Sequence, residues 1–126
     1  KCTKLQDVAL DFNCTNISDV GALAIGDCLA KCPELQKVVL GLNSTNNISD
    51  VGALAIGDCL AKCPELQKVV LDLINTNVGD AGASAIGAGL GRCPQLQEVR
   101  LWLDHTSVGD GGAGAIGAGL GLCPHL

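Results

Sequence analysis

One stretch of the sequence decides the fold: Leu66-Gln67-Lys68-Val69-Val70-Leu71-Asp72-Leu73-Ile74-Asn75-Thr76-Asn77-Val78-Gly79-Asp80-Ala81-Gly82-Ala83. In its first half, apolar residues alternate at Val69, Leu71 and Leu73, which predicts a strand with one buried face. The small and polar residues that follow predict a tight turn, and Asp80 is typical of the start of a helix. The stretch therefore predicts a strand, a turn and the beginning of a helix.

The same unit recurs along the whole chain. Cysteines spaced 30 or 31 residues apart each open a copy, and residues 16–40 are identical to residues 47–71. Such self-similarity is typical of repeat proteins, in which each repeat packs only on its neighbours. We expect a single domain over residues 1–126, with repeats at 2–31, 32–62, 63–92 and 93–122 and the start of a fifth repeat at 123–126.

Each copy changes from a period of two to a period of about 3.6, which predicts one strand and one helix per repeat. The alternating apolar residues of the strands are Val8-Leu10-Phe12, Val38-Leu40-Leu42, Val69-Leu71-Leu73 and Val99-Leu101-Leu103. The apolar residues at helical spacing are Ala22-Ile25-Leu29, Ala53-Ile56-Leu60, Ala83-Ile86-Leu90 and Ala113-Ile116-Leu120. Because proline cannot continue a helix, we expect the helices to end before Pro33, Pro64, Pro94 and Pro124.

An aspartate stands at the predicted start of every helix: Asp19, Asp50, Asp80 and Asp110. One carboxylate per repeat is too few for calcium, which needs about six or more converging oxygens. Aspartate is a preferred N-cap residue. We therefore expect these side chains to cap the helices that they begin, and we expect no metal or other cofactor.

This pattern resembles the leucine-rich repeat, in particular the helix-bearing form typified by ribonuclease inhibitor. The residues that carry the resemblance are Leu71-x-Leu73-x-x-Thr76-x-Val78-x-Asp80-x-Gly82-Ala83 and the later Ile86 and Leu90. The resemblance implies an α/β fold, a right-handed solenoid shaped as a horseshoe arc, with about four repeats. Its parallel strands would line the concave face and its helices the convex face.

Two features depart from that family. The repeat of 30 or 31 residues is longer than the usual length of about 20–29. Threonine also holds the position where the family has Asn or Cys, and its hydroxyl is able to satisfy buried backbone groups at a strand exit. We expect a ladder of such hydroxyls at Thr15, Thr45, Thr76 and Thr106.

Composition and charge exclude several partners. The formal net charge is −5, so we expect no nucleic acid, whose binding needs Lys and Arg to neutralise phosphates. We also expect no membrane insertion, because no run approaches the roughly 20 apolar residues of a membrane span. Glycines inside the predicted helices favour close helix packing along lines of small residues such as Ala22-Gly26-Ala30 and Ala83-Gly87-Gly91.

The eight cysteines have two interpretations. Their even number is compatible with disulfides, and Cys28 with Cys32, or Cys59 with Cys63, would suit a local bridge or a pair of metal ligands. Five of the eight instead share one repeat position, where a solenoid stacks the same small apolar side chain. We expect packing, because His105 and His125 do not stand at ligand spacing to these cysteines.

Sequons for N-glycosylation occur at the predicted strand-exit turns: Asn13, Asn16, Asn43 and Asn47. Asparagine is also an ordinary turn residue, and duplication of the repeat multiplies any match. If these sequons are used, the protein is extracellular. If they are only turn formers, the helix-bearing family favours the cytoplasm.

One set of side chains on the predicted concave face has the composition of an interface. In the last strand, burial of Leu101 and Leu103 turns Trp102 outward, beside Arg100, and exposed Trp and Arg are enriched at the centres of interfaces. The residues that we expect to bind a protein partner are Val39, Val70, Asp72, Arg100, Trp102 and Asp104. The alternative is that Trp102 packs over the last repeat and shields it.

The sequence carries no convincing catalytic motif. Gly-Ala-Gly-Leu-Gly at residues 87–91 resembles a nucleotide fingerprint, but it falls inside a predicted helix. A catalytic set built from Asp104, His105 and Ser107 is not expected, because neighbouring residues on one turn do not converge. We expect a protein that is not an enzyme.

Two non-enzymatic functions remain. Leu5 and Leu126 occupy the same repeat position, so we expect neither end to carry the polar cap that solenoids need for solubility. A longer solenoid, lost caps or head-to-tail contact between copies would each explain such ends, and a contact that does not close gives a filament. We favour a structural scaffold whose repeats stack end to end, with protein partners that include other copies of itself. The alternative is a discrete protein-binding module that uses its concave strand face.

Overall fold

Four strands alternate with four helices in the computed structural model, which describes residues 4–45 and 47–126. The predicted start of the first repeat at Cys2 lies outside the described residues. The elements are, in order, β1 (Asp7–Asp11), α1 (Asp19–Leu29), β2 (Lys37–Gly41), α2 (Asp50–Ala61), β3 (Lys68–Asp72), α3 (Asp80–Leu90), β4 (Glu98–Trp102) and α4 (Asp110–Leu120).

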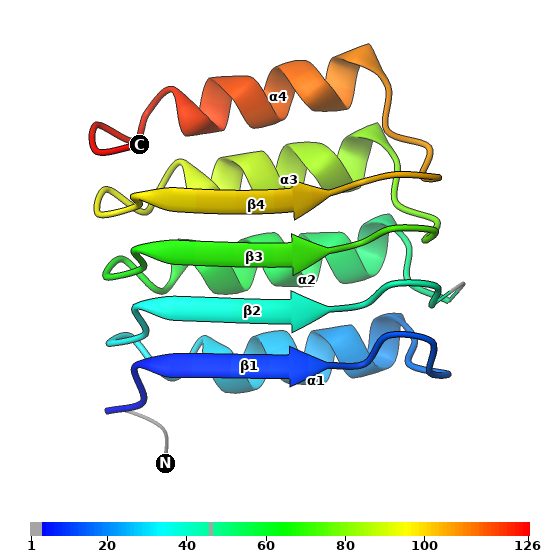
Figure 1. Ribbon diagram of the computed structural model, residues 1–126, viewed down its shortest axis with the longest axis horizontal. Coiled ribbons are helices and arrows are strands. Elements are labelled where there is room, and N and C mark those ends of the chain that lie inside the picture. Colours follow the sequence, from blue (N-terminus) through cyan, green and yellow to red (C-terminus); the bar gives the residue numbers. More distant parts are fainter. Residues whose placement is uncertain (1–3, 46) are drawn as a thin grey trace.

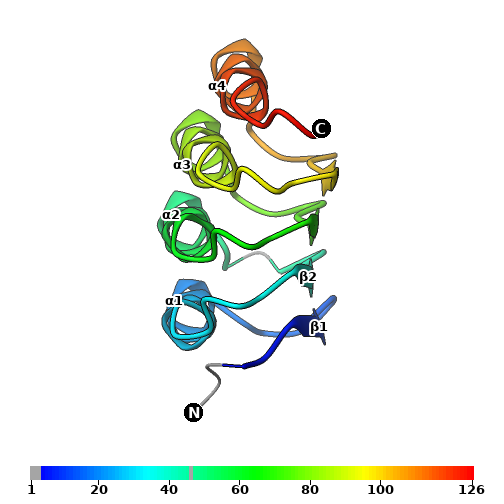
Figure 2. The same cartoon turned by 90° about the vertical axis from the view of Figure 1, so that its left-hand side faces the viewer.

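The strands form one parallel sheet in the order β1-β2-β3-β4, and equivalent residues of each repeat pair directly. Figure 1 shows the strands stacked in chain order, with the helices behind them. Figure 2, turned by 90°, shows two layers, in which the helices cover one face of the sheet and leave the other face open. The predicted architecture of about four α/β repeats is confirmed.

The core lies between the sheet and the helices and is built mainly from aliphatic side chains and cysteines. In the two inner repeats, the third apolar residue of each strand segment, Leu42 or Leu73, is fully buried. The equivalent Phe12 and Leu103 in the outer repeats are only partly buried. The core residues of a repeat are therefore fully buried only when a neighbouring repeat packs on each side.

Glycines allow the helices to approach one another closely. A Cβ atom added to Gly57 would overlap the carbonyl oxygen of Ala85, and one added to Gly89 would overlap that of Gly57. On the predicted small-residue lines, a Cβ added to Gly87 would lie 2.7 Å from the carbonyl oxygen of Ala115. The predicted role of helix glycines in close packing is thereby confirmed at these contacts.

Each helix begins at the predicted aspartate, but the expected capping role is wrong. The N-cap residues are Ser18, Ser49, Gly79 and Gly109, each one position earlier. The Oδ1 atom of Asp50 instead accepts the N–H groups of Gly79 and Gly82, at 2.7 and 3.0 Å, in the next repeat. The carboxylate therefore satisfies N–H groups at the start of the next helix, not of its own.

The same contact recurs between the other repeats. Asp19 accepts the N–H groups of Ser49 and Gly52, and its second oxygen accepts the Ser49 hydroxyl at 2.5 Å. Asp80 accepts the N–H groups of Gly109 and Gly112. We call these three contacts, made by Asp19, Asp50 and Asp80, the aspartate bridges. They satisfy the first N–H groups of each following helix, which have no partner inside their own helix.

The described cysteines at the shared repeat position, Cys32, Cys63, Cys93 and Cys123, are packed in the core, as expected. The Sγ atom of Cys93, just after α3, donates to the carbonyl of Leu60 in α2 at 3.2 Å, and that of Cys123, just after α4, donates to the carbonyl of Leu90 in α3 at 3.3 Å. Burial, with the neighbouring Cys63 and Cys123 thiols, raises the pKa of Cys93 to about 12. A hydrogen bond to Cys63, together with burial, raises the pKa of Cys59. Buried thiols with raised pKa values are chemically inert.

Candidate binding site on the open face of the sheet

Alternate residues of the four strands point to the open face and form three rows across the sheet. Because the strands are in register, each row takes one residue from each strand. The first row is charged, the second mainly apolar, and the third combines two carboxylates with a glycine and a tryptophan. The rows are Asp7-Lys37-Lys68-Glu98, Ala9-Val39-Val70-Arg100 and Asp11-Gly41-Asp72-Trp102.

A groove of about 240 Å³ crosses this face over the second and third rows. The side chain of Asn13 lies over Gly41, where an added Cβ would come within 2.8 Å of its Oδ1 atom, and Asp11 and Asp72 stand at the same position in the neighbouring strands. Trp102 is 41% exposed. The residues that line this open-face groove are Ala9, Leu10, Asp11, Asn13, Val39, Leu40, Gly41, Val70, Asp72 and Trp102.

The structure brings part of the predicted binding set together. Val39, Val70, Asp72 and Trp102 line the groove, and Arg100 and Asp104 are not among its lining residues. The prediction from sequence missed Asp11 and Gly41, although aligning the repeats places both in the same row as Asp72 and Trp102.

Hydrogen bonds fix the polar side chains that line the groove, Asp11, Asn13 and Asp72. Asp11 accepts the backbone N–H of Asn13 at 2.9 Å, and Asp72 accepts that of Ile74 at 3.2 Å. The side-chain oxygen of Asn13 accepts the backbone N–H of Asn43 at 2.7 Å, which links the first two repeats. Each carboxylate keeps further acceptor capacity, since two oxygens offer about four lone-pair sites.

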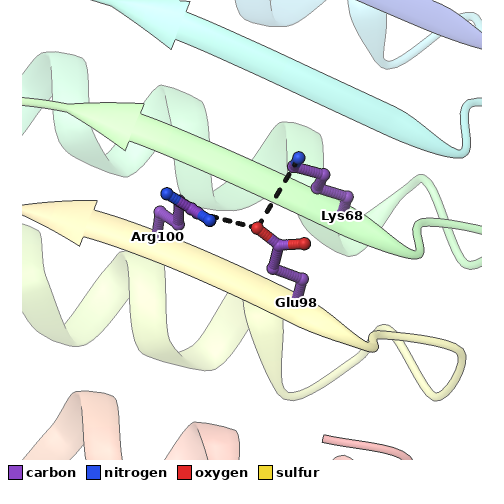
Figure 3. Close-up of polar contacts among 3 residues, drawn as sticks. All are labelled: Lys68, Glu98 and Arg100. Carbon is purple, nitrogen blue, oxygen red and sulfur yellow. Dashed lines mark hydrogen bonds and ion pairs between the residues drawn. The ribbon is translucent and has the colours of Figure 1, made fainter.

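Three charged side chains form a cluster at the other edge of the open face (Figure 3). Glu98 accepts a hydrogen bond from the Nε of Arg100 at 2.7 Å, and its carboxylate lies 3.6 Å from the Nζ of Lys68. The hydrogen bond from Arg100, aided by Lys68, lowers the pKa of Glu98. The cluster is solvent-exposed, so it contributes little to stability, and its single carboxylate offsets one of the two positive charges.

Comparisons with known proteins agree with the fold described above. A family model described as leucine-rich repeat matches residues 1–26 and 69–87. A comparison with curated proteins finds no match. Among solved structures, the actin-binding site 2 of leiomodin-1 matches with a TM-score of 0.71 and 18% identity, over 98% of this chain and 68% of that one. The fold is a leucine-rich-repeat solenoid.

The predicted threonine positions of the solenoid lie at the turns that follow the strands. The hydroxyl of Thr45 donates to the carbonyl of Leu42 at 2.5 Å, and that of Thr76 donates to Leu73 at 2.9 Å. Both threonines are buried. Thr15 and Thr106 make the same bond at 2.6 Å, and Thr15 is exposed. The hydroxyls therefore bind within their own repeat, three residues back.

The sequons of the solenoid fall into two pairs. Asn13 and Asn43 are half-buried, and both carboxamides make hydrogen bonds. Asn16 and Asn47 occupy equivalent positions in their repeats and are exposed. The second pair is the more accessible to modification, and its use stays a prediction.

A second apolar surface lies on the helices, where the sequence had suggested none. Val20 and Leu23 of α1, and Val51 and Leu54 of α2, are between 49% and 78% exposed. We call these four residues the helix-face patch. The sequence did carry a sign of this patch: within each helix its two apolar residues are three positions apart, next to the buried apolar residues of the same helix. In the later repeats the same positions hold Ala81, Ser84, Gly111 and Gly114.

Within residues 4–45 and 47–126, no three His, Cys, Asp or Glu side chains are grouped so as to hold a metal ion. No helix in the same ranges is long and apolar enough to cross a membrane.

Proposed function

We propose that the solenoid is a non-enzymatic interaction scaffold that binds a protein segment in the open-face groove. The observation that carries the proposal is the exposed Trp102 beside an apolar floor formed by Val39 and Val70. Exposed tryptophan next to an apolar pocket is typical of an interface centre, and ligand sites are concave and mostly apolar. The helix present in all four repeats supports the helix-bearing subtype typified by ribonuclease inhibitor.

Trp102→Ala should weaken binding of peptides selected against the whole chain from a random display library. Loss of a central aromatic side chain costs about 2 kcal/mol or more, which corresponds to about a 30-fold rise in Kd. The measurement is the Kd of a selected peptide, with far-ultraviolet circular dichroism to show that the variant is folded.

The matched comparison is Leu54→Ala, because Leu54 is a similarly exposed apolar residue on the helix-face patch. Unchanged affinity in Leu54→Ala, with loss in Trp102→Ala, supports the groove. The opposite pattern would move the binding surface to the helices and remove the groove from the function.

A specific observation also favours end-to-end stacking as a second function. Asp110 repeats the position of the three bridging aspartates, but it is exposed and accepts no N–H group in the described part of the chain. At the other edge, the N-cap of α1 makes no side-chain hydrogen bond. The two edges are therefore complementary, and both carry half-buried apolar residues.

Sedimentation of the purified chain tests this stacking function. We expect the average mass to rise with concentration, because each contact would bury the half-exposed core and form a fourth aspartate bridge. Asp110→Ala should shift that rise to about tenfold higher concentration, since a charge-assisted bond is worth about 1.5 kcal/mol. A monomer at every concentration would contradict stacking.

A further inference from the structure

We propose that the open-face groove recognises a lysine or arginine side chain presented by the bound segment. This inference rests on the proposed binding function and adds the chemistry of the partner. Three features of the groove carry it: the two carboxylates that line it, the apolar floor next to them, and the absence of a positively charged side chain among its described lining residues.

Two carboxylates stand on either side of the middle of the groove. Neighbouring strands are about 4.8 Å apart, so the Cα atoms of Asp11 and Asp72 lie about 10 Å from each other, with Gly41 and the side chain of Asn13 between them. Both carboxylates line the groove. An ammonium or guanidinium group bound in the groove would be attracted by both, and a guanidinium is able to donate to two carboxylates.

The floor suits the stem of the same side chain. Val39 and Val70 provide an apolar surface next to the carboxylates, and the methylene chains of Lys and Arg pack along such surfaces while their charged ends remain polar. Trp102 pairs with Asp72 in the sheet register, and its ring offers a face for a cation. A purely apolar side chain would fill the floor but would leave the negative charge of both carboxylates without an opposite charge from the bound segment.

The charges of the open face agree with this assignment. Of the groove's lining residues, all within the described chain, Asp11 and Asp72 carry a charge. The nearby cations Lys68 and Arg100 are held by Glu98. The groove therefore presents negative charge, and it should reject segments that carry a carboxylate at the same point.

Emission of the single tryptophan, Trp102, reports binding directly. The probes are pools of blocked pentapeptides without Trp or Tyr, whose central residue is fixed as arginine, lysine, citrulline or glutamate. We expect the arginine and lysine pools to change the emission of the whole chain with about tenfold lower half-saturating concentration than the citrulline pool. The preference should decrease as salt is raised.

Charge-only variants locate the interaction. Asp11→Asn and Asp72→Asn keep an oxygen that accepts the local backbone N–H, and each should remove most of the preference for arginine over citrulline. Asp7→Asn is the matched control, because Asp7 lies on the same strand and face but outside the groove, and it should retain the preference.

The outcomes separate the two proposals. If arginine and citrulline pools bind equally, or if Asp7→Asn loses the preference as fully as Asp11→Asn, recognition of a cation is overturned while binding in the groove stands. If no pool changes the emission of Trp102, both proposals are overturned.

Discussion

Gly89→Ala is expected to lower the free energy of unfolding by about 3 kcal/mol, the upper part of the usual range for overpacking. The added Cβ would overlap the backbone carbonyl of Gly57 in the neighbouring helix α2. Since the obstruction is backbone and not a flexible side chain, relief requires α2 and α3 to move apart. Such a movement would disturb the core below them, where Leu60 and Leu90 are fully buried.

The matched control is Gly114→Ala in α4. Apart from its chain neighbours and the nearby backbone of its own helix, no atom of the described residues lies within 4 Å of a Cβ added there, and alanine is favoured over glycine in a helix by about 1 kcal/mol. We therefore expect this variant to be more stable than the parent chain. Urea unfolding followed by circular dichroism measures both variants, and a shift of the same sign and size in each would contradict the packing account.

Asp50→Ala should lower the free energy of unfolding by about 2–3 kcal/mol, because it removes the acceptor of two backbone N–H groups between repeats. Those N–H groups belong to Gly79 and Gly82, and Gly82 is buried. A buried donor without a partner costs its desolvation energy in full. We expect Asp50→Asn to lose much less, since its side-chain oxygen still accepts.

Asp110→Ala is the control for this second variant, at low protein concentration where copies do not associate. Asp110 has the same helix position as Asp50, so any general effect of an acidic residue at a helix start is common to both. The same urea experiment should show a loss below about 0.5 kcal/mol for Asp110→Ala. An equal loss in both variants would mean that the aspartates act within their own helices, as the sequence alone had suggested.

Repetition made much of the architecture predictable. Alternation at Val69, Leu71 and Leu73 predicted β3, and the helical spacing of Ala83, Ile86 and Leu90 predicted α3; both elements are present with these residues buried. The aspartates marked the first residue of every helix. These signals are local, because they depend on the periods of single strands and helices.

The candidate site was predictable only in part. Outward orientation of Trp102 followed from the alternation of β4, but the groove is lined by residues of all four repeats. No pattern within one repeat shows that Asp11 and Asp72 flank Gly41, since they come from repeats one and three. The aspartate bridges were missed for the same reason: Asp50 acts on Gly79, 29 residues further along the chain.

The sequence by itself thus determined the repeat, its strand and helix, and the identity of the buried residues, because burial on one face imposes a period that can be counted. Only the tertiary structure decided what happens between repeats: the bridges from Asp19, Asp50 and Asp80 to the next helix, the contact of Gly89 with Gly57, and the groove across the open face. These features arise from the packing of neighbouring repeats, which brings together residues about 30 positions apart. Alignment of the repeats shows which residues share a row, but the contacts between them depend on how closely the repeats pack.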